Sequence, residues 1–181
     1  MPRIAPIDPQ STNPATAETL AAVKAKLGVL PNLFTTLAHS PAALNGYLQL
    51  GETLSKGRLT SRQREMIAIA VAQENRCEYC LSAHAAIGKG AGLSGEDIDR
   101  ARNGGATDAL DDAITDFAVQ LVRGRATVTS EQLQAIRDAG VNDGLVMEII
   151  AHVALNVLTN YVNRVADTEV DFPRVDLLSA A

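Results

Sequence analysis

Helix-start signals recur along this chain, and each one precedes an apolar segment with helical spacing. Two of them fit capping boxes, Thr60-Ser61-Arg62-Gln63 and Thr129-Ser130-Glu131-Gln132. Ser40-Pro41 adds an N-cap residue followed by proline at the first helical position. No six residues alternate between apolar and polar types as a half-buried strand would. These signals predict an all-α fold.

The same signals predict the order of the elements. Residues 1–16, rich in Pro, Ser, Thr and Asn, are expected to form an extended arm, residues 17–166 a single-domain helical bundle, and residues 167–181 a tail. Within the bundle, helices are expected over 17–27, 31–38, 41–57, 60–74 and 77–90, from 94 onward, and over 108–122, 129–140 and 142–165.

Length, composition and charge exclude several classes of protein. A chain of 181 residues suits one domain, and a 3% share of aromatic residues is typical of closely packed helices. A net charge of −5 argues against binding to the phosphate backbone of nucleic acids. No run approaches 18 uninterrupted apolar residues, and residues 1–9 contain no apolar signal core. We therefore expect no membrane span and a cytoplasmic location.

A weak internal repeat surrounds the two capping boxes. Ser55-Lys56-Gly57-Arg58 precedes the first box and Val122-Arg123-Gly124-Arg125 precedes the second, so each unit is a helix, a Gly-Arg turn and a capped helix. A duplicated helical hairpin explains this pattern, and so does chance use of common caps.

Cys77 and Cys80 are the two cysteines of the chain, and they form a C-x-x-C motif. This spacing favours paired chemistry, either redox or metal binding, over a framework of structural disulfides. Cys77, Cys80 and His84 are spaced i, i+3 and i+7, so they share one face of a helix, on which Gly88 leaves room. The first helical turn favours a thiolate, and an imidazole one turn away can exchange a proton with it. This combination suits thiol redox catalysis.

Zinc is the main alternative for the two thiols. Cys77, Cys80, His84 and a carboxylate would supply four ligands of the usual kind. However, closed structural zinc sites usually draw on separate loops, and three ligands on one continuous helix form only part of a tetrahedron. We therefore expect neither a metal nor another cofactor.

Glu65 is a further candidate, because its helical neighbours Ala68, Ile69 and Ala72 are apolar. A buried carboxylate is costly unless it is paired or functional, and burial favours its protonated form, which suits proton transfer. Alternatively, Glu65 lies at the surface rim of its helix or pairs with Arg62.

The last predicted helix carries a polar stripe. His152, Asn156, Thr159, Asn160 and Asn163 lie at i, i+4, i+7, i+8 and i+11 within an apolar segment, and polar groups there must find partners. They either line the catalytic pocket or form hydrogen bonds across a helix or subunit contact. We favour the second role for the stripe as a whole, and a pocket position for His152 and for Asn156 one turn away.

The pattern of Glu65, eleven residues and then Cys77-x-x-Cys80-x-x-x-His84 resembles the alkyl hydroperoxidase D and carboxymuconolactone decarboxylase superfamily. Further segments look like its peroxidase-related branch: Leu30-Pro31-Asn32-Leu33-Phe34, Leu59-Thr60, Arg64-Glu65 and Cys77-Glu78-Tyr79-Cys80. The similarity covers roughly residues 28–165.

This resemblance implies an all-α fold that assembles as a homotrimer or homohexamer and reduces hydroperoxides with a cysteine pair. It implies that Cys80 attacks the peroxide, that Cys77 resolves the sulfenic acid, and that Glu65 and His84 form a proton relay. Position in the helix alone favours Cys77 as the nucleophile, but His84 is the i+4 neighbour of Cys80, so we follow the family. The expected reductant is a dithiol of the lipoyl or thioredoxin type.

Tyr79 departs from the family pattern. The best-known members carry a histidine immediately before the second cysteine, and a phenol that is neutral at pH 7 does not replace an imidazolium. We expect Tyr79 to line the pocket.

Taken together, the cysteine pair, His84 and Glu65 favour a thiol peroxidase. The alternatives are a thiol–disulfide oxidoreductase that uses the same residues without peroxide, and a redox-sensing or metal-binding oligomeric module.

Overall fold

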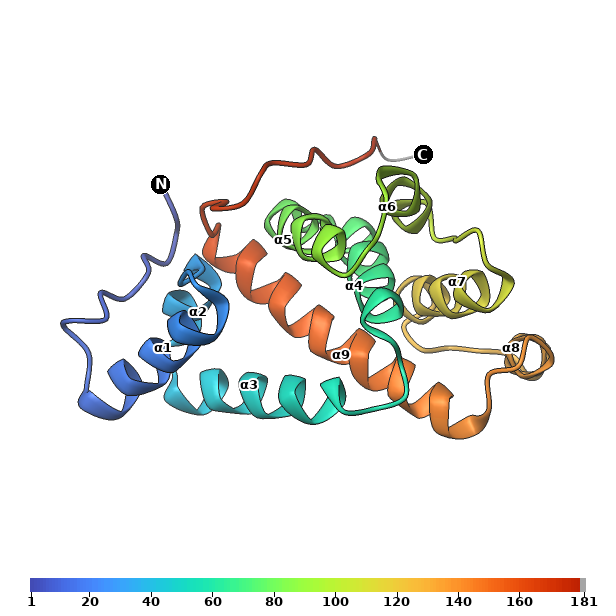
Figure 1. The fold of residues 1–181 in the computed structure, drawn as a ribbon, viewed down its shortest axis with the longest axis horizontal. Helices are drawn as coiled ribbons and strands as arrows, with labels where there is room; N and C mark the ends of the chain where they lie inside the picture. Colours follow the sequence, from blue (N-terminus) through green and yellow to red (C-terminus); the bar gives the residue numbers. More distant parts are fainter. Residues whose placement is uncertain (180–181) are drawn as a thin grey trace.

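The computed structural model describes residues 1–179, and this part of the chain consists of helices and irregular connections, with no strand (Figure 1). In chain order the helices are α1 (Pro14–Leu27), α2 (Asn32–Leu37), α3 (Pro41–Ser55), α4 (Ser61–Glu74), α5 (Glu78–Gly90), α6 (Gly95–Arg102), α7 (Ala109–Arg123), α8 (Ser130–Asp138) and α9 (Asp143–Ala166). The prediction of an all-α fold is confirmed.

Cap geometry determines where the helices begin and end. α1 starts at Pro14 rather than at residue 17, because the Asn13 side chain accepts the Thr16 N–H at 2.9 Å and proline takes the first helical position. The extended arm is therefore shorter than predicted and covers residues 1–13. Both predicted capping boxes are present, at Thr60 and Thr129.

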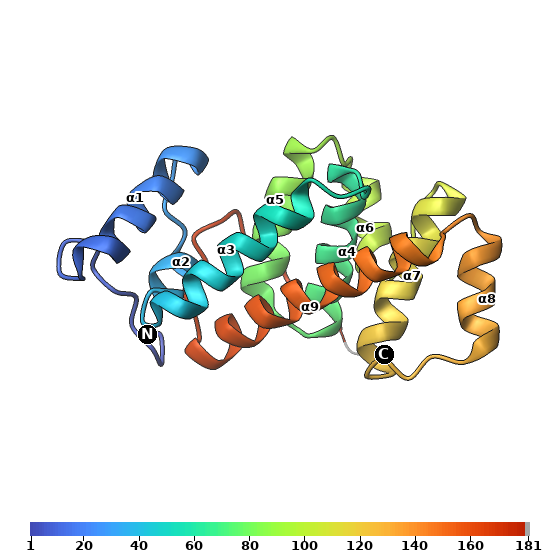
Figure 2. The ribbon, with the colours of Figure 1, turned by 90° about the horizontal axis from the view of Figure 1, so that it is seen from below.

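α4 lies at the centre of the molecule and packs against α5, α6, α7 and α9 (Figures 1 and 2). Its residues from Met66 to Gln73 are all buried. Met66 and Ile69 join an apolar cluster that includes residues of α1, α2, α5 and α6, whereas Ile67 and Val71 join a second cluster with residues of α7, α8 and α9. α4 therefore contributes residues to both hydrophobic cores and separates them.

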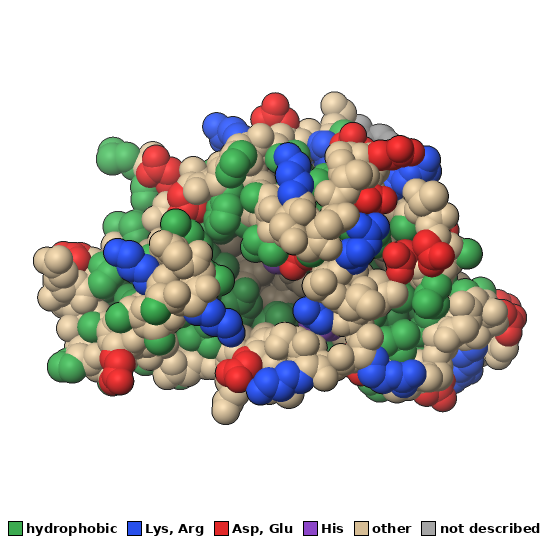
Figure 3. Space-filling view, in the orientation of Figure 1, with side chains coloured by type: hydrophobic (Ala, Val, Ile, Leu, Met, Phe, Trp, Pro, Cys, Tyr) green, Lys and Arg blue, Asp and Glu red, His purple; other side chains and the backbone are tan. Residues whose placement is uncertain are grey.

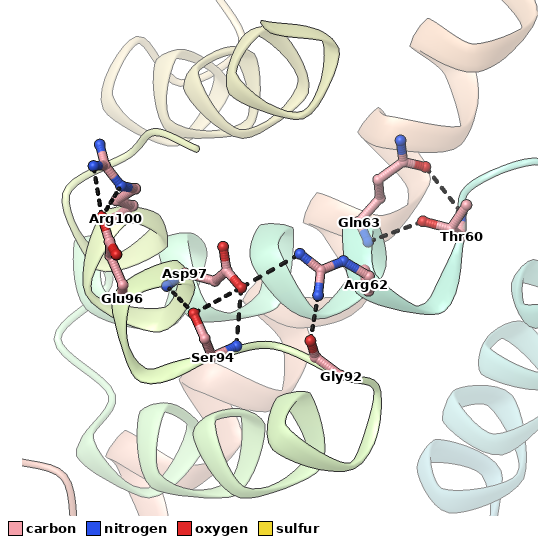
Figure 4. A network of polar contacts seen from close by, with 8 residues as sticks. All are labelled: Thr60, Arg62, Gln63, Gly92, Ser94, Glu96, Asp97 and Arg100. Atoms are coloured by element: carbon pink, nitrogen blue, oxygen red, sulfur yellow. Dashed lines mark hydrogen bonds and ion pairs between the residues drawn. The ribbon is translucent and has the colours of Figure 1, made fainter. Parts of the chain in front are cut away.

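Polar contacts join the first turns of α4 and α6 (Figure 4). Arg62 of α4 donates to the backbone carbonyl of Gly92 and pairs with Asp97 of α6 at 3.4 Å. The backbone N–H and the hydroxyl of Ser94 donate to the same carboxylate, which holds the pKa of Asp97 below its usual value. These contacts fix the loop after α5 against α4.

The two hairpins of the internal repeat have different surroundings. α4 is buried at the centre, whereas α8 lies at one end of the molecule and Ile136 is its one buried residue (Figure 2). The shared capping pattern thus does not extend to shared packing, and duplication stays a prediction.

α9 runs diagonally across the molecule and contacts α2, α3, α4, α5 and α7 (Figure 1). By length and composition alone it is able to cross a membrane, since an 18-residue window has a mean hydropathy of 1.5; 39% of that window is buried inside the molecule. Its sequence contains no uninterrupted apolar run of 18 residues, because polar residues interrupt it, among them His152, Asn156, Asn160 and Asn163. Those side chains are buried. The absence of a membrane span stays a prediction.

Residues 167–179, here called the C-terminal segment, return from the end of α9 across α5 toward α6 (Figure 1). Two helices hold this segment: Ser82 Oγ of α5 accepts the Val175 N–H at 3.0 Å, and Arg102 of α6 donates to the Asp176 carbonyl at 2.6 Å. The predicted tail is therefore packed as a cover over α5.

Candidate active site

The two cysteines lie at the N-terminal end of α5 and are joined as a disulfide. Cys77 is the N-cap residue of the helix, and its Sγ accepts the backbone N–H of Cys80 at 3.2 Å. Arg76, with a φ of 53°, makes the tight turn that leads from α4 into α5. Cys77 is 1% exposed and Cys80 is 2% exposed, so both sulfurs are shielded from solvent.

Glu65 and His84 meet between α4 and α5, where Glu65 Oε2 lies 2.8 Å from His84 Nδ1. Their side chains are 16% and 21% exposed, so the contact is partly shielded from water. Gly88 lies beside this contact, and a Cβ at that position would be in ordinary van der Waals contact with the Cβ of Glu65, at 3.6 Å. The alternative partner, Arg62, binds Asp97 instead. The structure thus brings together two of the four residues predicted to be catalytic, on helices that face each other.

A cavity of about 380 Å³ opens beside this pair. Figure 3 shows a hollow between α2, α3 and α5, with apolar side chains in its wall and charged and histidine side chains at its edge. The apolar lining includes Val29, Pro31, Phe34, Ala83, Ile87 and Leu155, and the polar lining includes Tyr47, Arg64, Glu65, His84, His152 and Asn156. The cavity therefore suits an apolar molecule with one polar end.

Cys80 does not itself line the cavity in the disulfide form, but helical geometry places it on the same side of α5 as the residues that do. At about 100° per residue, the cavity-lining residues Tyr79, Ala83, Ile87 and His84 spread over an arc of about 140° around the helix axis. Cys80 falls inside that arc, between Ile87 and His84. In the disulfide its sulfur is bonded to Cys77, and reduction frees the side chain on the side of the helix that faces the cavity.

Tyr79 forms a wall between this cavity and a larger groove of about 1100 Å³ that reaches Cys77. Its hydroxyl accepts the backbone N–H of Leu33 at 3.1 Å, and its ring meets Phe172 of the C-terminal segment edge-on at 5.8 Å. Burial raises the pKa of Tyr79, so the phenol stays neutral. Tyr79 lines the cavity, and its hydroxyl is occupied by a backbone contact.

Two asparagines of the α9 stripe reach across to other elements. Asn160 Oδ1 accepts from the Asn75 side chain at 2.9 Å, which agrees with the predicted cross-helix role. Asn163 Nδ2 donates to Cys80 Sγ at 3.3 Å. Asn163 was expected to belong to the structural part of the stripe, whereas the structure places its amide against the sulfur of the site.

His152 and Asn156 both line the cavity. His152 is 5% exposed, and its Nε2 has no hydrogen-bond partner within residues 1–179. Burial lowers the pKa of His152, and the positive charge of Arg64 acts in the same direction, so the imidazole is held neutral. Asn156 donates to the backbone carbonyl of His152 at 2.8 Å and so uses its amide within its own helix.

The polar or aromatic lining residues that were given no place in the pocket from the sequence include Tyr47, Arg64 and Phe172. Tyr47 of α3 packs its ring 6.1 Å from that of Phe34, and burial together with the charge of Glu65 raises the pKa of Tyr47 to about 12. Arg64 precedes Glu65, so adjacency was a usable signal. Tyr47 and Phe172 had none, because a single aromatic residue in an exposed helix or in a segment without periodicity does not point to a pocket.

Within residues 1–179, no group of three or more His, Cys, Asp and Glu side chains is arranged to hold a metal ion. Both thiols are joined to each other, and His84 faces Glu65. The residues of the zinc alternative therefore do not form a metal site in this form of the protein.

Comparison with known sequences adds a family context. Residues 41–124 match the model of the carboxymuconolactone decarboxylase family. An alkyl hydroperoxide reductase of Mycobacterium tuberculosis is 34% identical over 82 residues, which are 45% of this chain and 24% of that protein. The chain spans less than half the length of the curated relatives that it matches.

Comparison with solved structures concerns nearly the whole chain. An alkylhydroperoxidase AhpD core structure, a peroxidase-related protein from Ralstonia eutropha, aligns with a TM-score of 0.85 and 26% identity over 94% of this chain and 92% of that chain. The debrominase Bmp8 aligns with a TM-score of 0.78 and 18% identity over 93% and 91% of the two chains, which is a likeness of fold alone. The predicted type of helical bundle is therefore confirmed.

Proposed function

Since residues 41–124 match the model of the carboxymuconolactone decarboxylase family and the chain has the AhpD-like fold, we propose that it is a thiol-dependent peroxidase acting through Cys77 and Cys80. The observation that carries the proposal is the Glu65–His84 contact of 2.8 Å, one helical turn from Cys80. A proton relay beside a cysteine pair is what hydroperoxide reduction requires. A relative named alkyl hydroperoxide reductase supports an oxidoreductase of this kind.

The proposed cycle begins with both cysteines reduced. Cys80 loses its proton to His84, and Glu65 stabilises the resulting imidazolium. The Cys80 thiolate attacks the distal oxygen of the hydroperoxide, an S–O bond forms as the O–O bond breaks, and His84 returns the proton to the leaving alkoxide. The product is an alcohol, and Cys80 becomes a sulfenic acid.

Cys77 then closes the oxidative half of the cycle. Its sulfur attacks Cys80 Sγ, the S–S bond forms as the S–O bond breaks, and the hydroxide leaves as water with the proton of the Cys77 thiol. Two thiols have thus supplied two electrons to the hydroperoxide. The disulfide between Cys77 and Cys80 is the form that the structure contains.

The cavity supports an organic hydroperoxide as the substrate. Its apolar wall and its volume of about 380 Å³ suit an alkyl or aryl group, which hydrogen peroxide lacks. Glu65 and His84 lie at the wall of this cavity, next to the helical face of Cys80. The peroxide end of the substrate therefore belongs near His84, with the carbon skeleton against residues such as Ile87 and Leu155.

We propose that a dithiol of the lipoyl or thioredoxin type reduces the disulfide from the groove on the other side of Tyr79. This groove reaches Cys77 and is lined by the end of α9 and the C-terminal segment. Hydroperoxide and reductant then approach opposite sides of the start of α5. A cytoplasmic location, where cellular thiol systems keep cysteines reduced, suits this cycle.

We also propose that the chain assembles as a homotrimer or homohexamer through α9. This helix exposes a stripe of large apolar side chains at successive spacings of three, eight, three and four residues, which share one face of the helix; such a stripe is costly in water and suits a subunit contact. The stripe consists of Met147, Ile150, Leu158, Tyr161 and Val165, which are 38–64% exposed.

The test is the consumption of cumene hydroperoxide and of hydrogen peroxide, with dihydrolipoamide, reduced thioredoxin or dithiothreitol as the donor. We expect faster loss of cumene hydroperoxide, no turnover in Cys80→Ser and, when no donor is added, a single turnover ending at the sulfenic acid in Cys77→Ser. Absence of peroxide loss with every donor, in protein that still forms and loses its disulfide, overturns the proposal.

That outcome would favour a thiol–disulfide oxidoreductase instead. The observation behind this second candidate is Tyr79, which places a neutral phenol, engaged with Leu33, where the best-known relatives have an imidazole. Reduction of a disulfide-bonded test peptide by the dithiol form of the protein measures this activity directly.

A further inference from the structure

Asn163 contacts the sulfur at the centre of the proposed cycle through a hydrogen bond between α9 and α5. Its Nδ2 donates to Cys80 Sγ at 3.3 Å, and both residues are buried, at 3% and 2% exposure. The other end of the amide, Oδ1, has no hydrogen-bond partner within residues 1–179. A buried acceptor without a donor destabilises the state in which it occurs.

The backbone holds Asn163 firmly in this position. Its carbonyl accepts the N–H groups of Asp167 and Thr168, the latter at 3.0 Å, where the chain leaves α9 through a left-handed C-cap at Asp167. The amide is therefore fixed near the sulfur by the end of its helix, whether or not the sulfur changes its chemical state.

The strength of the hydrogen bonds that the Asn163 amide can form depends on the redox state of Cys80. A disulfide sulfur is a weak acceptor and carries no hydrogen, so it binds Nδ2–H weakly and offers nothing to Oδ1. A thiolate accepts the same N–H in a charge-assisted bond, and a thiol or a sulfenic acid brings a hydrogen that Oδ1 can accept. The amide thus has better partners in every state of Cys80 other than the disulfide.

We propose that Asn163 sets the redox poise of the Cys77–Cys80 pair by stabilising the reduced and sulfenic forms of Cys80 over the disulfide. It acts as a hydrogen-bond donor to the attacking thiolate and makes the disulfide easier to reduce. The inference rests on the proposed function for its role in turnover, whereas its test uses no peroxide.

The experiment compares Asn163→Ala with Asn160→Ala in the full-length protein. Asn160 is a matched control, because it is a fully buried asparagine one turn earlier in α9 whose amide binds Asn75 rather than sulfur. The first measurement is the pH midpoint of Cys80 alkylation by iodoacetamide in reduced Cys77→Ser protein. The second is the reduction potential of the intact pair, from equilibration with dithiothreitol buffers.

We expect Asn163→Ala to raise the alkylation midpoint by about one pH unit, because a charge-assisted hydrogen bond to the thiolate is lost. The equilibrium for reducing the disulfide should fall by roughly tenfold, which corresponds to a shift of about 30 mV toward more negative potential. Asn160→Ala should leave both quantities unchanged.

Asn163→Asp serves as the second variant if the alanine protein does not fold. The carboxylate has nearly the same shape and no donor at neutral pH, so its charge should raise the alkylation midpoint at least as far as the alanine change does. Unchanged midpoints and potentials in folded Asn163 variants overturn the inference, and so do equal shifts in Asn160→Ala. A pair that never oxidises reversibly would instead refute the proposed function.

Discussion

Glu65 is the residue at which a catalytic and a purely structural interpretation of the site give opposite expectations. In Glu65→Gln the side chain keeps its shape and still reaches His84, but it no longer stabilises an imidazolium. We expect hydroperoxide turnover to fall by roughly 10²-fold or more, since general acid–base assistance is worth that much. The pH midpoint of Cys80 alkylation should rise in the same variant.

Glu74→Gln is the control for this change, because Glu74 lies at the end of the same helix and binds Arg123 at 2.6 Å, away from α5. It should keep wild-type turnover. Wild-type alkylation rates in Glu65→Gln across pH 5–9 would remove Glu65 from the mechanism and leave Cys77, Cys80 and His84.

Residue spacing predicted part of the site and missed the rest for identifiable reasons. Cys77, Cys80 and His84 lie on one helix, so helical geometry alone placed them together. Residue spacing did not identify the partner of Glu65, because contacts between helices depend on packing. The family resemblance supplied His84 as that partner. Asn163 and Phe172 come from segments more than eighty residues away, and no local pattern links them to the cysteines.

At the scale of helices, Gly88 lies where α5 packs against both α4 and Leu93 of the loop that follows α5. A Cβ there would lie 2.9 Å from Leu93 Cδ1, inside a core where neighbours have little room to move. Gly88→Ala should therefore lower the free energy of unfolding by about 1–2 kcal/mol, since overpacking outweighs the gain in helix propensity. Urea denaturation measures this loss.

Gly90→Ala provides the comparison within the same helix. Nothing lies within 4 Å of a Cβ at Gly90, so this variant should match or slightly exceed wild-type stability. Equal stability of the two variants would show that the Leu93 side chain moves aside for a Cβ at position 88 at no cost.

His152 gives α9 a stability that depends on pH. Burial and the charge of Arg64 lower its pKa, although Glu148 and Glu65 act in the opposite direction. Below about pH 6.5 the unfolded chain therefore binds a proton that the folded chain does not, so this residue lowers the free energy of unfolding as the pH falls. His152→Gln should lose less stability than wild type between pH 7.5 and pH 5 in urea titrations.

His39→Gln is the matched control, because His39 is an exposed loop histidine whose Nε2 lies 2.8 Å from the Ala5 carbonyl oxygen. It should follow the wild-type pH profile. Parallel profiles for wild type and His152→Gln would contradict the assignment of a neutral, buried imidazole.

Capping signals predicted the helices well because caps are local. The boxes at Thr60 and Thr129 and the proline after Ser40 mark α4, α8 and α3 within a residue of their starts. The packing of the helices was harder to predict from the sequence. Nothing in it indicates that α4 is central and α8 peripheral, although both begin with the same capping box. Burial depends on which helices meet, and that is decided by contacts between distant segments.

For the molecule as a whole, the exposed stripe of α9 predicts an assembly of identical chains. Leu158→Glu combined with Tyr161→Glu places charges in that stripe and should release monomers of 19.1 kDa, measured by light scattering. Ile4→Glu changes an exposed apolar residue outside α9 and should leave the assembly intact. A wild-type protein that is already monomeric at micromolar concentration would refute the proposed oligomer.

The C-terminal segment, which packs over α5, is synthesised well after the cysteine pair. Phe172 and the rest of the C-terminal segment follow Cys80 by about 90 residues in the chain. At about 5–20 residues per second, the ribosome adds these residues roughly 5 to 20 seconds after the cysteine pair. During that interval the two cysteines lack both the C-terminal segment and the amide of Asn163. Their first redox state is therefore set by the surrounding solution rather than by the finished protein.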